Sequence, residues 1–165
     1  MTEKRVRVKI YSRITDISAI HATEKILGEE AAIDAAEDDI IEYSTDGVIT
    51  ERGDTVELSY EESVDMGMEN TRTALVFKKQ EPNTLTMART GENSAGLIFS
   101  DTEKRQPCSY NVGGYAFNFC IYTRRIENKI TLEGGTLNLD YVIEVQGVKT
   151  QRNRFEIKVD EMRVY

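Results

Sequence analysis

The sequence lacks the residues on which most catalytic and metal sites depend. It contains one histidine, two cysteines and no tryptophan among 165 residues. A two-histidine metal site is therefore impossible, and a zinc site would need His21 together with both cysteines. A Ser-His-Asp or Cys-His arrangement would also have to use His21, beside which no nucleophile can be placed. We expect His21 to be an exposed polar residue, and we expect no catalytic residues, no metal site and no cofactor.

Long apolar runs are also missing. No stretch approaches the roughly 18 apolar residues that a membrane-spanning helix needs, and "MTEKRVRVKIY" at the start has no continuous apolar core of a secretory signal. We therefore expect a cytoplasmic protein that does not enter a membrane. In that compartment Cys108 and Cys120 are expected to be free thiols, because disulfides are rare there.

Positive charge is scarce as well. The formal net charge is −8, from 21 lysines and arginines against 29 acidic residues. An acidic chain without a basic block repels phosphate backbones, so we expect no nucleic-acid partner.

The glycine pair Gly113-Gly114 does not make a phosphate-binding loop. Such loops are followed by a helix, whereas "YAFNFCIYT" after this pair is a strand pattern. The glycines instead predict a turn or bulge. A two-residue turn places Cys108 opposite Phe119, and a three-residue turn makes Cys108 and Cys120 neighbours. Both registers remain open at this point.

Most of the chain alternates apolar and polar residues with a period of two, which is the pattern of half-buried strands. The clearest runs are "RVRVKIY" (5–11), "TVELSYEE" (55–62), "TLTMART" (84–90), "AFNFCIYT" (116–123), "TLNLDYVIEV" (136–145) and "RFEIKV" (154–159). Turn signals such as Gly53-Asp54 separate them. This spacing predicts an all-β antiparallel meander, sandwich or barrel in one domain over residues 1–165. Residues 16–39 break the alternation, and we expect a short helical or irregular insert there.

Two charged residues share the apolar face of their strands. Glu62 has the parity of Val56 and Leu58, and Arg89 has the parity of Met87. If these faces line an interior, a carboxylate and a guanidinium enter apolar space, which is tolerable when they are paired. One interpretation is a polar anchor for a small ligand, to which Tyr60, Tyr110 and Tyr141 could add hydroxyl groups. The other is a structural ion pair near a strand end.

Several short motifs, in their order along the chain, resemble the YwiB-like family of uncharacterised bacterial β-barrel proteins. The motifs are "DGVITERGDTVELSYEES", "DMGMENTRT", "MARTG" and "LIFSDTEKRQPCSYNVGGY". The resemblance implies an antiparallel up-and-down barrel of about 8–10 strands, lipocalin-like or calycin-like, with an interior cavity. It implies no known activity.

Two functions of different kinds fit these observations. The first is a non-catalytic barrel that binds a small apolar or amphipathic ligand, with Tyr60, Glu62, Arg89, Tyr110 and Tyr141 as candidate lining residues. The second is a protein-interaction or structural module with a filled interior, which could act as a homodimer. An enzyme is the least favoured reading, since fold analogy alone supports no chemistry.

Overall fold

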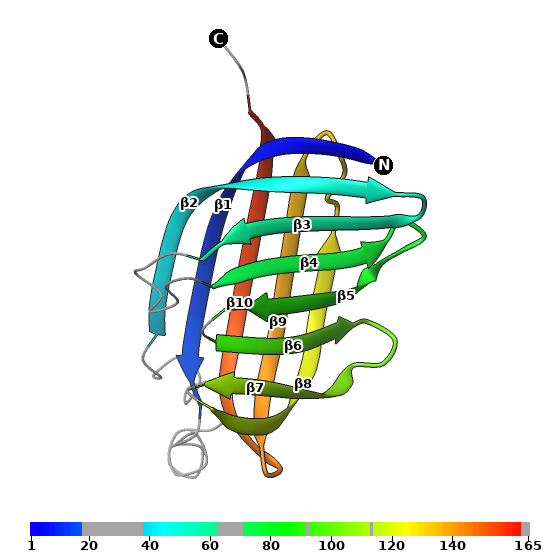
Figure 1. The fold of residues 1–165 in the computed structure, drawn as a ribbon. Coiled ribbons are helices and arrows are strands. Elements are labelled where there is room, and N and C mark those ends of the chain that lie inside the picture. Colours follow the sequence, from blue (N-terminus) through cyan, green and yellow to red (C-terminus); the bar gives the residue numbers. More distant parts are fainter. Residues whose placement is uncertain (18–37, 63–70, 92, 113, 163–165) are drawn as a thin grey trace.

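The computed structural model describes residues 1–17, 38–62, 71–91, 93–112 and 114–162, and these residues form ten antiparallel strands (Figure 1). The strands are β1 (Thr2–Asp16), β2 (Asp38–Arg52), β3 (Thr55–Glu61), β4 (Arg72–Lys78), β5 (Glu81–Thr90), β6 (Asn93–Ser100), β7 (Arg105–Val112), β8 (Tyr115–Asn128), β9 (Gly135–Val145) and β10 (Val148–Glu161).

The strands follow one another around a closed barrel, each paired with the next along the chain, and β1 closes the ring by pairing with both β2 and β10. This is the antiparallel up-and-down barrel that the family resemblance implies. The ring is least complete between β6 and β7, which pair only over Asn93–Gly96 and Ser109–Val112. Because the strands alternate in direction, β1, β3, β5, β7 and β9 all end at the same end of the barrel.

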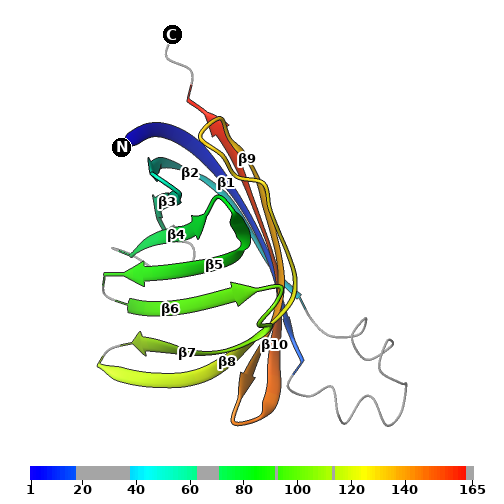
Figure 2. The same ribbon diagram turned by 90° about the vertical axis from the view of Figure 1, so that its right-hand side faces the viewer.

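The barrel consists of two strand layers that cross at a steep angle. Strands β3–β7 run across the front of Figure 1, while β9 and β10 pass behind them, and Figure 2 shows the two layers from the side. β2 and β8 bend from one layer into the other. In β8 the register to β9 shifts between Thr123 and Arg125, and such a bulge bends a strand.

The hydrophobic core fills one end of the barrel. Its buried side chains come from alternate positions of the strands, such as Val6, Val8 and Ile10 on β1 or Leu137 and Leu139 on β9. These are the inward positions predicted from the period-two runs. The other end, where the odd-numbered strands finish, holds more polar side chains and is described below.

The expected insert at 16–39 is wrong at its margins. Asp16 is the last residue of β1, and Asp38 and Asp39 begin β2, where they pair with Thr15 and Ile14. The physical reason is a set of side-chain hydrogen bonds between the two strands. Arg13 and Thr15 both donate to the Asp38 carboxylate, and these bonds extend the pairing of β1 with β2. Residues 18–37 of the expected insert, with His21 among them, lie outside the described residues.

Candidate functional site

Glu62 and Arg89 lie together inside the barrel. Glu62 follows β3, where its backbone N–H donates to the carbonyl oxygen of Thr71 at 2.9 Å and so continues the strand pairing. Arg89 is the next-to-last residue of β5. Its Nε lies 3.7 Å from Glu62 Oε1, and the two side chains are 16% and 2% exposed, respectively. The parity argument therefore placed both charges correctly, and burial makes their pairing necessary.

The Glu62 carboxylate is held mainly by hydroxyl groups. Tyr43 on β2 donates a hydrogen bond to Oε2 at 2.6 Å, and Thr73 on β4 donates one to Oε1 at 2.5 Å. Each oxygen thus accepts a short hydrogen bond, which stabilises the charged form in a buried place. Sequence reasoning missed both donors. Thr73 shares the inward parity of Leu75 and Phe77 and could have been found, but Tyr43 adjoins the segment expected to be an insert.

Two donors beside this carboxylate have no acceptor. The buried Nε of Arg89 and the buried hydroxyl of Tyr60 make no hydrogen bond within the described part of the chain. Burial, and then the negative charge of Glu62, raises the pKa of Tyr60 well above its usual value. The Tyr60 phenol is therefore a neutral donor at physiological pH. Unpartnered buried donors of this kind are uncommon and call for an explanation.

Arg89 also lines a cavity of about 290 Å³ at the end of the barrel where the odd-numbered strands finish. The lining side chains come from β1, β5, β6, β7, β8, β9 and β10, and they are Ser12, Ile14, Met87, Arg89, Ala95, Leu97, Tyr110, Phe119, Tyr141, Ile143, Val145, Gln151, Asn153 and Phe155. Most are apolar, as is usual for ligand pockets, and the volume is at the small end of the usual range of about 300–1,000 Å³. Val145 is largely exposed, so the cavity reaches solvent.

The five candidate residues from the sequence divide into two groups. Arg89, Tyr110 and Tyr141 line the cavity, whereas Tyr60 and Glu62 do not line it and lie beside Arg89. Tyr141 packs its ring against Phe99, with centroids 4.8 Å apart. Sequence reasoning missed the polar side chains of Ser12, Gln151 and Asn153, because β1 was expected to end before its polar half and the start of β10 read as a turn.

The two-residue turn register is the one that the structure adopts. Cys108 pairs with Phe119, and the two thiols point to opposite faces of the β7–β8 hairpin. Both thiols are free. Burial raises the pKa of Cys108, which makes its thiol a poorer nucleophile.

Aromatic residues extend the inner face of β8 beyond the cavity. Phe119 lines the cavity, and along the strand Phe117 and Tyr115 have the same parity but are 56% and 73% exposed. Tyr110 is the cross-strand partner of Phe117. The open end of the barrel is thus bordered by exposed aromatic side chains on one side.

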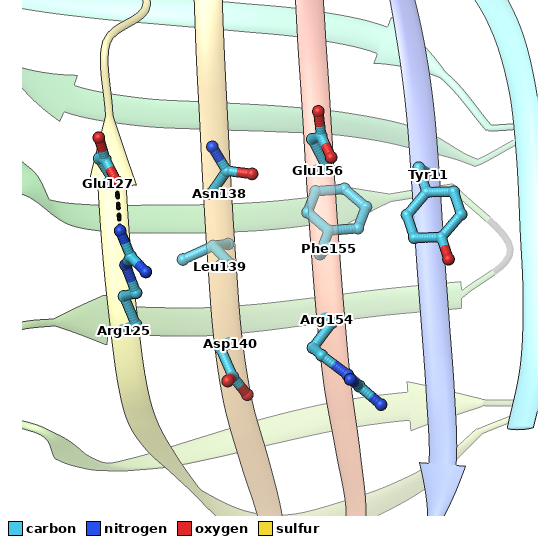
Figure 3. Close-up of a pocket in the computed structure, with 9 residues that line it drawn as sticks. All are labelled: Tyr11, Arg125, Glu127, Asn138, Leu139, Asp140, Arg154, Phe155 and Glu156. Atoms are coloured by element: carbon cyan, nitrogen blue, oxygen red, sulfur yellow. Dashed lines mark hydrogen bonds and ion pairs between the residues drawn. The ribbon is translucent and has the colours of Figure 1, made fainter.

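A second hollow lies on the outer wall of the barrel, over β1, β8, β9 and β10. In Figure 3, Arg125 pairs with Glu127 on this wall. Asp140 on β9 is the cross-strand neighbour of Arg154, and Glu156 lies farther along β10, level with Asn138. Three of the polar side chains in this hollow belong to ion pairs, namely the exposed pair of Arg125 with Glu127 and the half-buried pair of Asp140 with Arg152. It is a less suitable ligand site than the interior cavity, because exposed ion pairs contribute little and bury little apolar surface.

Two further kinds of site were sought in the described residues. No group of three or more His, Cys, Asp or Glu side chains is arranged there to hold a metal ion. Nor does that part of the chain contain a helix of the length and apolar character needed to cross a membrane.

Comparison with known proteins gives a family and a fold. Residues 26–157 match the sequence model of a family described as "Domain of unknown function (DUF1934)". The fold is similar to that in the crystal structure of the ywiB protein from Bacillus subtilis, with a TM-score of 0.73 and 15% sequence identity over 98% of this chain and 94% of that chain. At this identity the likeness shows a shared barrel fold. Among curated proteins, none matches the sequence.

Proposed function

The chain belongs to the DUF1934 family of domains of unknown function, and on that premise we propose that it is a non-catalytic barrel that binds a small molecule in its open end. The observation that carries the proposal is the cavity of about 290 Å³, in which apolar side chains surround a few polar groups. Arg89 lies at its wall, and the buried Nε of this side chain has no acceptor among the described residues. Convergent polar groups in an apolar hollow are the usual form of a ligand site.

The free thiols of Cys108 and Cys120 support a cytoplasmic location, because oxidising compartments favour disulfides. The net charge of −8 argues against nucleic acid as the partner.

Native mass spectrometry of the full chain, purified gently from cells, tests this proposal. We expect a bound species whose mass is lost when the same sample is denatured. The Ala95→Phe variant places a ring in the cavity and should remove that species while the circular dichroism spectrum stays that of the wild type. Ala116→Phe is the matched control, since Ala116 is exposed on the outer face of β8. Retention of the same mass by Ala95→Phe would contradict binding in the cavity.

The alternative function, an interaction module that works as a homodimer, is favoured by one observation. Tyr115 and Phe117 are large, exposed and adjacent on one face of β8, and exposed aromatic groups are common at interfaces. The same native spectra decide this point, because a dimer without a bound small molecule supports the alternative and a monomer with one supports the cavity.

A further inference from the structure

The groups around Arg89 indicate what kind of molecule the cavity accepts. We infer that the ligand is a small monocarboxylate with an apolar body, whose carboxylate accepts hydrogen bonds from the Arg89 guanidinium. This inference rests on the proposed function and adds the chemical class of the ligand to it.

The first step is that Arg89 has hydrogen-bonding capacity to spare. A guanidinium carries five N–H donors and no acceptor. The buried Nε of Arg89 donates to no atom of the described chain, and its distance of 3.7 Å to Glu62 Oε1 is too long for a hydrogen bond. Glu62 in turn already accepts one hydrogen bond at each oxygen, from the hydroxyl groups of Tyr43 and Thr73. The ion pair therefore compensates the charge of Arg89, but it leaves the Nε–H of Arg89 without a hydrogen-bond acceptor in the described part of the chain.

The second step is that the neighbouring groups supply donors too. The hydroxyl of Tyr60 is buried without a partner close to the same ion pair. Tyr141 lines the cavity and interacts electrostatically with Arg89. An incoming group at this wall thus meets the N–H donors of Arg89 and the O–H donor of Tyr141, whereas Tyr60 lies beside Arg89 and does not line the cavity. The ligand group that suits these donors best is one with acceptor oxygens. A carboxylate fits, because its two oxygens match the planar donor fork of arginine.

The third step concerns charge. The Glu62 carboxylate already offsets the charge of Arg89, so each negative charge on a ligand leaves this part of the site net negative. One such charge is compensated by direct hydrogen bonds from the guanidinium, whereas a second is not. This argues for a monocarboxylate over a dicarboxylate or a phosphate, which carries more charge at neutral pH. A cation is disfavoured by the guanidinium that it would have to approach.

The fourth step concerns the rest of the ligand. Apart from Arg89, the wall formed by β5 and β6 is apolar, with Met87, Ala95 and Leu97. The volume of about 290 Å³ equals that of about ten water molecules at about 30 Å³ each. The body of the ligand is therefore short and apolar. On β10, which lies opposite β5 in the ring of ten strands, the amides of Gln151 and Asn153 offer a further polar contact.

Three probes of equal chain length test the inference by isothermal titration calorimetry on the full, ligand-free chain. They are octanoate, 1-octanol and octylammonium. We expect octanoate to bind at least about tenfold more tightly than 1-octanol, which is the effect of one charge-assisted hydrogen bond. We expect octylammonium to bind most weakly.

Variants then test which residue provides the preference. Arg89→Met should make octanoate and 1-octanol bind alike, but it leaves Glu62 buried without its charge partner and could unfold the chain. The double variant Glu62→Gln with Arg89→Met removes both charges, keeps an acceptor oxygen for one of the two hydroxyl groups of Tyr43 and Thr73, and should show the same loss of preference. Glu62→Gln alone should bind octanoate several-fold more tightly, because the competing negative charge is gone. Arg125→Gln, on the outer wall, is the control and should bind as the wild type does.

The possible outcomes separate the two proposals. Equal binding of octanoate and 1-octanol, or a preference that persists in the double variant, overturns the carboxylate inference and leaves the cavity as a binding site. Preference for octylammonium also overturns it and assigns recognition to Glu62. If no probe binds and native spectra show no retained mass, both the inference and the proposed function are wrong.

Discussion

Tyr43 and Tyr60 bring the same hydroxyl group to the same buried ion pair, yet their situations differ. The Tyr43 hydroxyl donates to Glu62 at 2.6 Å, whereas the Tyr60 hydroxyl has no partner in the described chain. A hydrogen bond to a charged acceptor stabilises by about 1.5–3 kcal/mol, and a buried donor without a partner costs about 1–3 kcal/mol. The two residues therefore contribute to stability with opposite signs.

Removing each hydroxyl in turn should show these signs. In ligand-free protein, Tyr43→Phe should lower the free energy of unfolding by about 2 kcal/mol, because Glu62 loses a donor. Tyr60→Phe should raise it by about 1 kcal/mol, because an unpaired buried hydroxyl is removed. Urea denaturation followed by circular dichroism measures both. If Tyr60→Phe destabilises as much as Tyr43→Phe, the Tyr60 hydroxyl has a partner that the structure does not show.

The dependence of stability on alkaline pH gives a second test of the burial of Tyr60. Burial raises the pKa of Tyr60 well above 10, the value of an exposed phenol. In the unfolded chain the phenol ionises near that value, so ionisation favours the unfolded state as pH rises. Stability from this group is complete below about pH 10 and is lost as pH rises toward the folded pKa. The Tyr60→Phe variant should therefore lose less stability than the wild type between about pH 9 and pH 11.

At the scale of the element, the close approach of β2 to β1 and β3 depends on a residue without a side chain. Gly47 faces inward, opposite Tyr60 on β3 and Val6 on β1. A methyl group at this position would lie 2.8 Å from a methyl of Val8 and 2.9 Å from the carbonyl oxygen of Ser59. The second contact is with backbone, which cannot move aside without disturbing the pairing of β2 and β3.

Gly47→Ala should therefore destabilise the barrel by about 2 kcal/mol, as overpacking of a close-packed interior does. Gly96→Ala is the matched control, because Gly96 is also within a strand but has open space where a methyl group would be placed. We expect Gly96→Ala to change the free energy of unfolding by less than about 0.5 kcal/mol. Thermal and urea denaturation of the two variants measure the difference, and equal stability of the two would contradict a steric role for Gly47.

The elements also show what the sequence could and could not predict. The alternation of apolar and polar residues correctly placed Glu62 and Arg89 on inner faces, because each strand is half buried. It could not reveal the bulge at Arg124, after which the inward positions of β8 change from odd to even numbers, as at Thr123 and Ile126. Nor could it find the cavity-lining Asn153, since its place in the cavity depends on closure between β1 and β10, which are far apart in the chain.

For the whole molecule, the barrel interior has two ends with different packing. One end is filled by buried aliphatic and aromatic side chains. The other holds the cavity, the ion pair and most of the polar side chains that face inward. Native interiors are close-packed elsewhere, so a cavity of this size on the axis of a closed barrel loses packing energy unless a ligand fills it. The same strand, β5, passes through both ends, with Leu85 in the packed part and Arg89 at the cavity.

The difference in packing between the two ends can be measured by replacing one leucine at each end with alanine. Leu85 is fully buried in the packed end, and Leu97 lines the cavity while remaining almost as buried. Leu85→Ala should lower the free energy of unfolding by about 4 kcal/mol, because it adds the cost of a new cavity to the lost transfer energy. Leu97→Ala should cost about 2 kcal/mol, because the vacated space joins a cavity that solvent already reaches. Urea denaturation of both variants tests this. Equal costs would mean that the interior is packed throughout, and they would remove the physical basis for a ligand site in the barrel.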